Sequence, residues 1–534
     1  MNAQSPPSWV PVRPGEWPLV AATGVFAFLA VALAIVLRTW SDAVFLTYFD
    51  VSYVPWLFVA SALVFVPATF GYAWMAPRLG SVWLNTLLLG AFGVATVACA
   101  RFAQNPLGVF AAVLVVSVFS PLANVICWNT ILDRLDSRQS RRLLPVIGGI
   151  STFGAIGGGA LGGELALIHG HEALVWLSFG LLVLMTPLPL LLSAPLRRRS
   201  TPRHTPGIQE GFQSLARNRL IGVVALATFL MALSTNVIDY QFKAHAQQAL
   251  APEALGTFFA RFHGATNLAV LLVQFLVAPV VMRRFGVGLS FALHPAILIV
   301  GALATLAAPV LATVVALRFA DTLLKFTFHK NSNDLALTPV PAHDRHQAMV
   351  FLKGIVYPLG GISAGVLLAG SSVLGFDLMH AGGFWVMLLA SLWLLLARQV
   401  RVHYLQQIGD KLSIDLHPVR PPSPEAPAPL MQALRSQVIE IRRLQRHLRE
   451  TGDPETGPAI TAALDGLFGT MGDLIGDPRA VEAAAQRYLY GDGSDRASAV
   501  ELLDTLLDTH RIPDATDLLD SLSRDRTRGL LPAT

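Results

Sequence analysis

Residues 18–39 read PLVAATGVFAFLAVALAIVLRT, an apolar run in which Arg38 is the sole charged residue. A helix of about 20 apolar residues crosses the hydrocarbon core of a bilayer, so this stretch predicts a membrane-spanning helix. No small-residue cleavage site follows the run, and we therefore expect the helix to remain in the mature protein.

Eleven further apolar stretches of similar length follow this one along the chain. They are predicted as spans at 53–76, 82–101, 106–131, 143–168, 172–195, 220–241, 256–282, 287–308, 310–330, 349–372 and 379–397. The composition agrees, because 53% of the residues are hydrophobic and 14% are charged, against about 25% charged in soluble proteins. The predicted fold class is all-α: a polytopic membrane protein with twelve transmembrane helices in two six-helix halves, plus a small soluble helical domain.

Arginines between the predicted spans indicate the orientation of the chain. The loops 169–172, 308–311 and 374–380 contain no Lys or Arg. By the positive-inside rule, both termini are predicted to be cytoplasmic, in a bacterial inner membrane. The arginines that decide this are Arg134, Arg138, Arg141 and Arg142 after the fourth span, Arg197, Arg198, Arg199 and Arg203 after the sixth, and Arg283 and Arg284 after the eighth.

Hydrophobicity falls after residue 400, where a proline-rich stretch precedes amphipathic helical sequence. We predict a cytoplasmic segment at 1–17, a first half at 18–196, a basic linker at 197–219 and a second half at 220–400. A proline-rich linker at 401–429 and a soluble helical domain at 430–526 complete the prediction.

Several kinds of chemistry are excluded. The sequence holds no GxxxxGK[ST], GxSxG or HExxH pattern, so we expect no catalytic residue, no enzyme activity and no cofactor. Cys99 and Cys127 lack metal-ligand spacing, and no metal site is expected. The net charge of +5 reflects loop arginines that set membrane orientation, not nucleic-acid binding.

A glycine-rich stretch at 148–163 lies inside the fifth predicted span. Small residues at a spacing of four let helix backbones approach closely, so a packing surface is the favoured interpretation. A direct role in binding a ligand is the alternative.

Charged residues within the spans are the candidates for a solute pathway, since they are costly in hydrocarbon. Opposite charges four residues apart share one helix face, as in Arg38 with Asp42, Asp239 with Lys243, and Asp321 with Lys325. Mutual neutralisation of each pair is the structural alternative. The candidate substrate-binding residues are Arg38, Asp42, Asn129, Asp239, Lys243, Asp321, Lys325 and Lys330.

The two halves can be compared by a shift of 201 residues, which places Lys243 on Asp42 and brings Asp239 near Arg38. Polar residues then recur at corresponding places in two otherwise apolar halves. Such duplication is typical of transporters whose halves move about a central site.

Three stretches resemble the bacterial and plastid-type ATP/ADP translocases and their relatives in the major facilitator superfamily. They are WNTILDRLDSRQSRRLLPVIGGISTFGAIGG at 128–158, VIDYQFK at 237–243 and DTLLKFTFHKNSND at 321–334. The stretch SDRASAVELLDTLL at 494–507 resembles the HEAT-like tail of some bacterial members. The resemblance implies twelve helices, alternating access and nucleotide exchange.

This chain departs from the exchangers, which use two lysines and two glutamates in the membrane to bind substrate. Its first half contains no lysine, and Glu164 is the one glutamate near a span interior.

The favoured function is a secondary transporter of an anionic, nucleotide-like solute. The alternatives are a proton-coupled exporter of an amphipathic or lipid-like compound and a non-transporting membrane sensor or scaffold. The expected partners are the solute, membrane lipids and a protein that binds the C-terminal domain, with no nucleic acid.

Overall fold

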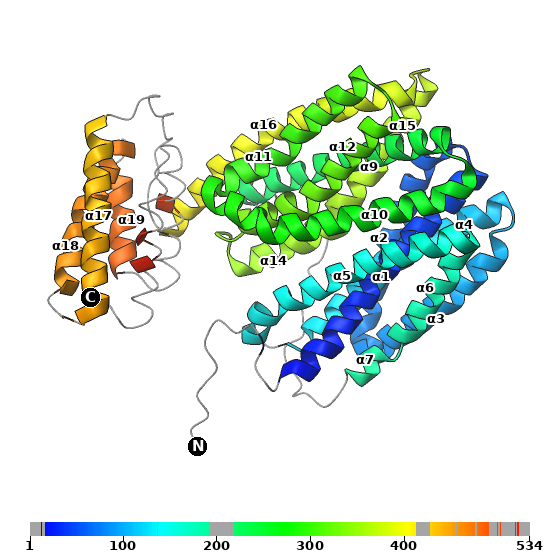
Figure 1. Cartoon of the computed structure of the whole chain (residues 1–534), viewed down its shortest axis with the longest axis horizontal. Coiled ribbons are helices and arrows are strands. Elements are labelled where there is room, and N and C mark those ends of the chain that lie inside the picture. The colour runs from blue at the N-terminus through cyan, green and yellow to red at the C-terminus, as the bar shows by residue number, and fades with distance from the viewer. Residues whose placement is uncertain are drawn as a thin grey trace.

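A computed structural model describes most of the membrane part of the chain and parts of the tail. The described residues are 12, 16–135, 137–192, 215, 217–412, 428–451, 453, 456–475, 478–490, 499, 502–503, 518–519 and 521–522. Within these ranges the regular elements are all helical, as the all-α prediction requires (Figure 1).

The first half consists of long apolar helices joined by short turns. In chain order they are α1 (Trp17–Tyr48), η2 (Val51–Tyr53), α2 (Val54–Leu79), α3 (Ser81–Phe102), α4 (Pro106–Leu132), α5 (Ser137–His169), α6 (Glu172–Met185) and α7 (Leu188–Leu191).

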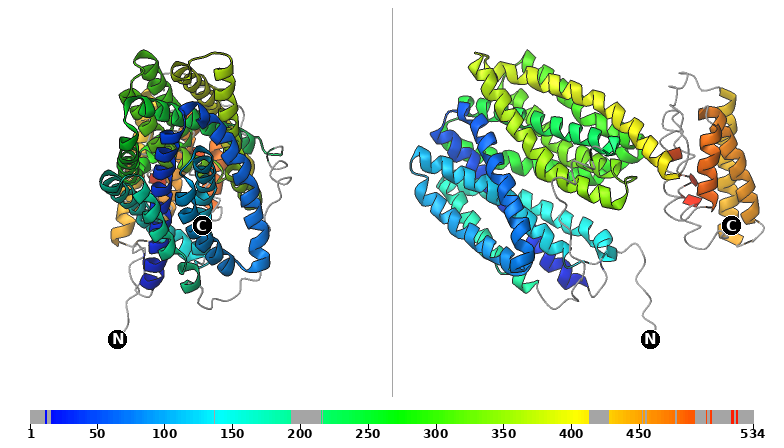
Figure 2. Two further views of the ribbon diagram at one scale, coloured as in Figure 1. Left: turned by 90° about the vertical axis from the view of Figure 1, so that its right-hand side faces the viewer. Right: turned by 180° about the vertical axis from the view of Figure 1, so that it is seen from behind.

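The second half repeats this arrangement beside the first (Figures 1 and 2). Its elements are α9 (Arg219–Ala249), α10 (Pro252–Leu276), α11 (Ala278–Ala307), α12 (Leu311–Leu324), η3 (Lys325–His329), α13 (Lys330–Ala336), α14 (Ala342–Phe351), η4 (Leu352–Val356), α15 (Tyr357–Val373) and α16 (Leu378–Leu412).

Eleven helices within the described ranges are long and apolar enough to cross a membrane. The remaining predicted span, 310–330, is the run α12–η3–α13, which contains a turn of π-helix at Lys325–His329. A second π-turn, η4, interrupts the run from α14 to α15. A π-turn inserts a residue into the helix and is frequent at functional sites. The twelve-helix layout in two halves is consistent with the prediction.

Several predicted boundaries were wrong, because helices continue past the apolar sequence. The predicted loop at Arg283 and Arg284 lies inside α11, and α5 begins at Ser137, before the predicted span. The predicted proline-rich linker begins inside α16, which ends at Leu412. Arginine and glutamine favour helix nearly as well as leucine does, so a span need not end at the membrane surface.

The glycines of α5 form contacts on two faces. A Cβ atom at Gly158 would lie 2.8 Å from the Ala32 oxygen of α1, and one at Gly159 would lie 2.5 Å from the Gly264 Cα of α10. These contacts confirm the packing interpretation for residues 154–163, whereas Gly148 has open space beside it. The α5–α10 contact is also a direct seam between the two halves.

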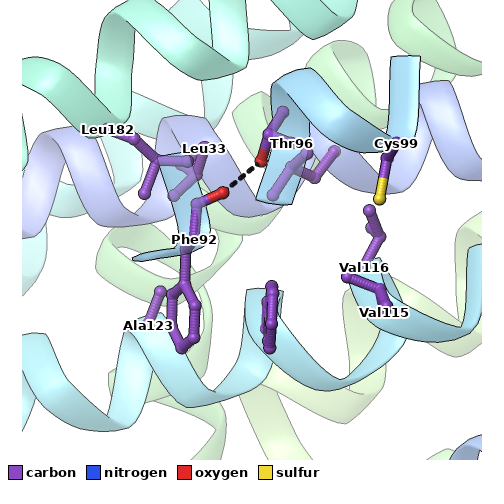
Figure 3. A pocket seen from close by; sticks show the side chains of 10 residues that line it. Leu33, Phe92, Thr96, Cys99, Val115, Val116, Ala123 and Leu182 are labelled. Atoms are coloured by element: carbon purple, nitrogen blue, oxygen red, sulfur yellow. Dashed lines mark hydrogen bonds between the residues drawn. The ribbon is translucent and has the colours of Figure 1, made fainter. Parts of the chain in front are cut away.

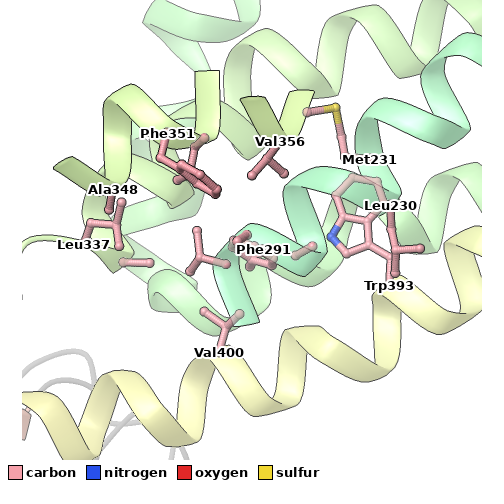
Figure 4. Close-up of a cluster of buried hydrophobic side chains, with 14 of the residues drawn as sticks. Leu230, Met231, Phe291, Leu337, Ala348, Phe351, Val356, Trp393 and Val400 are labelled. Atoms are coloured by element: carbon pink, nitrogen blue, oxygen red, sulfur yellow. The ribbon is translucent and has the colours of Figure 1, made fainter. Parts of the chain in front are cut away.

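The core of the second half is a layer of apolar side chains between α9, α11, α14, η4 and α16 (Figure 4). Phe291 and Trp393 are fully buried there, at 1% and 0% exposure. Trp393 of this layer packs against the ring of His294, with the ring centroids 4.7 Å apart.

The tail contains α17 (Ala428–Thr451), α18 (Thr456–Ile475) and α19 (Pro478–Tyr490), which pack side by side (Figures 1 and 2). Leu467, Met471 and Val481 are fully buried between them. Most of the basic linker and of the HEAT-like stretch at 494–507 lies outside the described residues, so the resemblance of the tail stays a prediction.

Candidate functional site

A network of buried charges joins the two halves where α1 faces α9. The Lys243 Nζ atom lies 2.7 Å from Asp42 Oδ1 and 2.9 Å from Asp239 Oδ2. All three side chains are at most 10% exposed. Lys243 therefore bridges an aspartate of its own helix and one of the opposite half.

Arg38 forms the second link between the halves. Its Nη2 atom donates to Asp239 Oδ1 at 2.9 Å, and its Nε atom lies 3.7 Å from Asp42 Oδ2. The Arg38 side chain is 42% exposed, so it is the most accessible member of the network.

Arg318 of α12 extends the network into the second half. One arm of its guanidinium donates to Asp239 at 2.5 Å and the other donates to Asp321 at 3.1 Å. Asp321 also accepts from the Thr235 hydroxyl at 3.0 Å, and His294 Nε2 lies 3.3 Å from the same carboxylate. Asp321 and His294 are fully buried.

The two contacts between α1 and α9 join residues that are 201 positions apart. Arg38 meets Asp239, and Asp42 meets Lys243. Equivalent residues of duplicated halves face each other in this way when the halves are related by a local twofold axis. The charge order is reversed, because α1 carries cation then anion while α9 carries anion then cation.

Five of the eight predicted site residues are brought together in this network: Arg38, Asp42, Asp239, Lys243 and Asp321.

The other three predicted residues lie outside it. Lys325 is half-buried, and Lys330 is exposed at the start of α13. Asn129 lies in the last turn of α4, beside a polar contact in which Asn85 donates to Thr130 at 3.0 Å.

Asp321 and Lys325 form no direct ion pair among the described residues, although Lys325 lies close enough to act electrostatically on the Asp321 carboxylate. Within the described residues Asp321 pairs with Arg318 and His294 instead. The Lys325 N–H still bonds the Asp321 carbonyl, so the two residues keep the α-helical spacing, but the Lys325 ammonium lies 5.2 Å from the centroid of the Phe326 ring.

Sequence reasoning missed Arg318, His294 and Thr235. A search at i,i+3 as well as i,i+4 would have found Arg318, which precedes Asp321 by three residues. His294 and Thr235 reach Asp321 from other helices, and no spacing in the sequence indicates those contacts.

The ends of α1 and α9 are also joined near their C-termini. The Gln247 amide donates to the carbonyl oxygens of Leu46 and Phe49, both at 2.7 Å, and its oxygen accepts from the Val51 N–H at 3.0 Å. One side chain thus closes the halves together at this end of the membrane part.

A cavity inside the first half does not fit a solute. It has a volume of about 10 Å³ and is lined chiefly by apolar side chains such as Leu33, Phe92 and Val116 (Figure 3). The Thr96 hydroxyl donates to the Phe92 carbonyl at 2.8 Å, so the polar group in this wall is already satisfied. A space of this size holds about one water molecule.

The network contains three cations and three carboxylates, so its formal charges cancel while His294 is neutral. Such an arrangement can bind a charged solute only by exchanging one of its internal ion pairs for a contact with the solute. It can also hold the halves together when no solute is present.

No protein-family model matches the chain, and no curated protein matches it by sequence. Solved structures do match. The nucleoside transporter NupG is 14% identical with a TM-score of 0.56, covering 72% of this chain and 99% of its own. A bacterial homolog of the human lysosomal transporter Spinster, inward-facing and unoccupied, is 14% identical with a TM-score of 0.53, covering 74% and 99%. A D-xylose-proton symporter is 14% identical with a TM-score of 0.53, covering 71% and 97%. The chain therefore has the fold of major-facilitator-type transporters.

Proposed function

We propose that this chain is a secondary transporter that moves an anionic organic solute by alternating access between its halves. The observation that carries the proposal is the buried network joining Asp42 and Arg38 to Asp239 and Lys243. Charges inside a membrane are costly and usually mark a pathway. A scaffold that never opens could join its halves with small and apolar residues alone.

Lysines beyond the balanced network favour an anion as the solute. Lys325 is half-buried, while Lys330 and Lys353 are exposed; Lys330 lies within electrostatic range of Asp334 and of Lys353. An ammonium group that faces lipid inside a span is costly, so an aqueous pathway is the better setting for these side chains. A compact ammonium can pair with phosphate or carboxylate. The translocase resemblance makes a nucleotide the first solute to test.

Proton coupling is a second candidate for how transport is driven. His294 and Asp321 are in contact with no exposure to solvent. A buried acid and imidazole can exchange a proton when the ion pairs around them rearrange. The D-xylose-proton symporter shares the fold.

We further propose that both termini are cytoplasmic and that the end closed by Gln247 faces the periplasm. The two cysteines, Cys99 and Cys127, are buried, so an added cysteine can be labelled above a low background. A cysteine replacing His169 should react with an impermeant reagent in intact cells, and one replacing Leu79 should not. The reverse pattern would invert the orientation.

Purified protein in liposomes tests the transport proposal. A thermal-shift screen against nucleotides, other organic anions and lipids selects the ligand, and its labelled form is then used for uptake into liposomes loaded with the same compound. We expect uptake that is strongly reduced in Lys330→Gln and Lys353→Gln, because each change removes a cation that would attract the solute.

Arg78→Gln is the matched control, since Arg78 is an exposed cation that packs on Trp74 at the end of α2. Its uptake should equal that of the native protein. Uptake of neutral or cationic compounds only, or full uptake in the variant that carries both Lys330→Gln and Lys353→Gln, would refute the anion assignment. Uptake that depends on a pH gradient and fails in Asp321→Asn would support proton coupling.

A further inference from the structure

An open groove lies along the first turns of α10, at the seam between the halves. Its volume is about 700 Å³. The first half contributes Ala166 and Leu167 from α5, and α12 contributes Val315. The remaining lining residues are Glu253, Ala254, Thr257, Phe258, Arg261 and Phe262 of α10.

The floor of the groove is aromatic and the rim is charged. Phe262 is 9% exposed and Phe258 is half-buried. On the rim, Arg261 and Glu164 have side chains 60% and 64% exposed, and Arg261 Nη2 lies 3.5 Å from Glu164 Oε1. Such a long, exposed ion pair contributes little stability. Its groups are therefore available to a ligand.

The surrounding bilayer would supply a lipid as the occupant of this groove. The groove opens on the face of α5 and α10 that would contact the bilayer, and its apolar floor matches an acyl chain. Arg261 lies nine residues into α10, about 13 Å from the helix start at 1.5 Å per residue, and a long arginine side chain can extend toward the headgroup region.

The rim charges distinguish among headgroups. One guanidinium can bind a phosphate; Glu164 lies 3.5 Å from it, and Glu253 adds a second carboxylate in the first turn of α10, eight residues before Arg261. A purely anionic headgroup would meet those carboxylates unfavourably, and a choline headgroup has no N–H to donate to them. An ethanolamine ammonium has three donors for carboxylate oxygens.

We propose that this groove is a binding site for an aminophospholipid such as phosphatidylethanolamine, with its phosphate on Arg261 and its ammonium on Glu253 and Glu164. The site takes the lipid as a regulator, separate from the transported solute. A lipid seated there contacts both halves at once, so it favours the arrangement in which α5 and α10 are packed together.

The aromatic floor links the groove to the charged network. Phe258 and Phe262 pack on Phe242 of α9, with ring centroids 5.6 and 4.5 Å apart. Phe242 directly precedes Lys243, which holds the two halves together. Filling the groove therefore restrains the helix that carries the network.

Thermal shifts of the detergent-purified full chain test the site with added dioleoyl-phosphatidylethanolamine, -phosphatidylglycerol or -phosphatidylcholine. Native mass spectrometry counts the bound lipids in parallel. We expect phosphatidylethanolamine to raise the melting temperature more than the other two, and Arg261→Ala to lose most of that rise and of the bound lipid. Glu253→Gln should abolish the preference for phosphatidylethanolamine over phosphatidylglycerol.

The shift is measured against the lipid-free form of each variant, so a loss of intrinsic stability does not obscure the result. Arg261→Lys should retain part of the response. Arg101→Ala, a change of an exposed arginine at the end of α3, is the matched control and should behave as the native protein. Equal shifts in Arg261→Ala and native protein, or equal shifts with all three lipids, would overturn the proposal. Neither readout depends on transport.

Discussion

Asp239→Ala should lower the stability of the folded protein more than the removal of any single cation that Asp239 binds. Its carboxylate accepts from Lys243 at 2.9 Å, Arg38 at 2.9 Å and Arg318 at 2.5 Å. In Asp239→Ala these three cations would share the carboxylates of Asp42 and Asp321 alone. Leaving a buried charge without its partner costs about 3–5 kcal/mol. The contact with Arg38 adds less, because Arg38 is partly exposed and water screens it.

The change Lys243→Ala is expected to cost less. Asp239 keeps Arg38 and Arg318, and Asp42 keeps Arg38 at 3.7 Å. In the double variant Asp239→Ala/Lys243→Ala, the two remaining cations of the network face two remaining carboxylates, so the formal charges cancel again. We therefore expect the double variant to be more stable than Asp239→Ala, with a coupling free energy of roughly 0.5–3 kcal/mol.

Circular-dichroism melting of the purified single and double variants measures this order. Arg78→Gln provides an exposed-cation control and should melt with the native protein. A double variant that melts as low as the sum of the two single losses would refute the reasoning, since the residues would then act independently. Liposome uptake of the same variants separates structure from binding. If Lys243 contacts the solute, the double variant recovers stability but no uptake.

Three further outcomes are expected. Gly158→Leu should lower the yield and the melting temperature, because the leucine side chain would overlap the Ala32 backbone. The control Gly148→Ala, whose side chain would enter open space, should lower neither. Equal melting temperatures of the two variants would contradict the packing interpretation. Gln247→Ala should favour separation of the C-terminal ends of α1 and α9, since three hydrogen bonds between the halves are lost. Cross-linking of cysteines placed at the C-terminal ends of α1 and α9 would measure this separation. Unchanged cross-linking would contradict the role of Gln247 in closing this end. Burial lowers the pKa of His171, and the charge of Glu172 offsets this shift only in part. As far as this group is concerned, the folded protein therefore keeps its full stability above about pH 6.5, where His171 is neutral, and loses stability as the pH falls below that value. Melting at pH 7.5 and 5.5 should show a smaller acid loss in His171→Gln than in the native protein.

The sequence predicts the fold well because membrane insertion depends on the length and apolarity of each segment, and both can be read directly from one sequence. It predicts the pair Asp239 and Lys243 for a related reason, since both lie on one helix and their spacing fixes their shared face. Contacts between different helices are not predicted by spacing along the sequence. Asp42 reaches Lys243 across the interface, and the comparison of the halves at a shift of 201 was the one sequence signal for that contact.

The direction that each side chain takes limited the remaining predictions. Asp321 and Lys325 keep the α-helical spacing, yet the Lys325 ammonium lies beside the Phe326 ring and not on the Asp321 carboxylate. The contacts of Asp321 with His294 and Thr235 depend on how three helices pack. Helix packing of this kind is set by side-chain shape along whole interfaces, which no short motif records.

The reversed charge order on α1 and α9 has a consequence for the separation of the halves. When the contacts between α1 and α9 break, α1 retains Arg38 with Asp42, and α9 retains Asp239 with Lys243, each at the i,i+4 spacing. Neither surface is left with a net charge, because each cation can turn to the aspartate on its own helix. Two ion pairs between the helices are lost on separation, while the ion pair within each helix remains. Opening then requires reorientation of side chains and not the creation of a bare charge in the membrane.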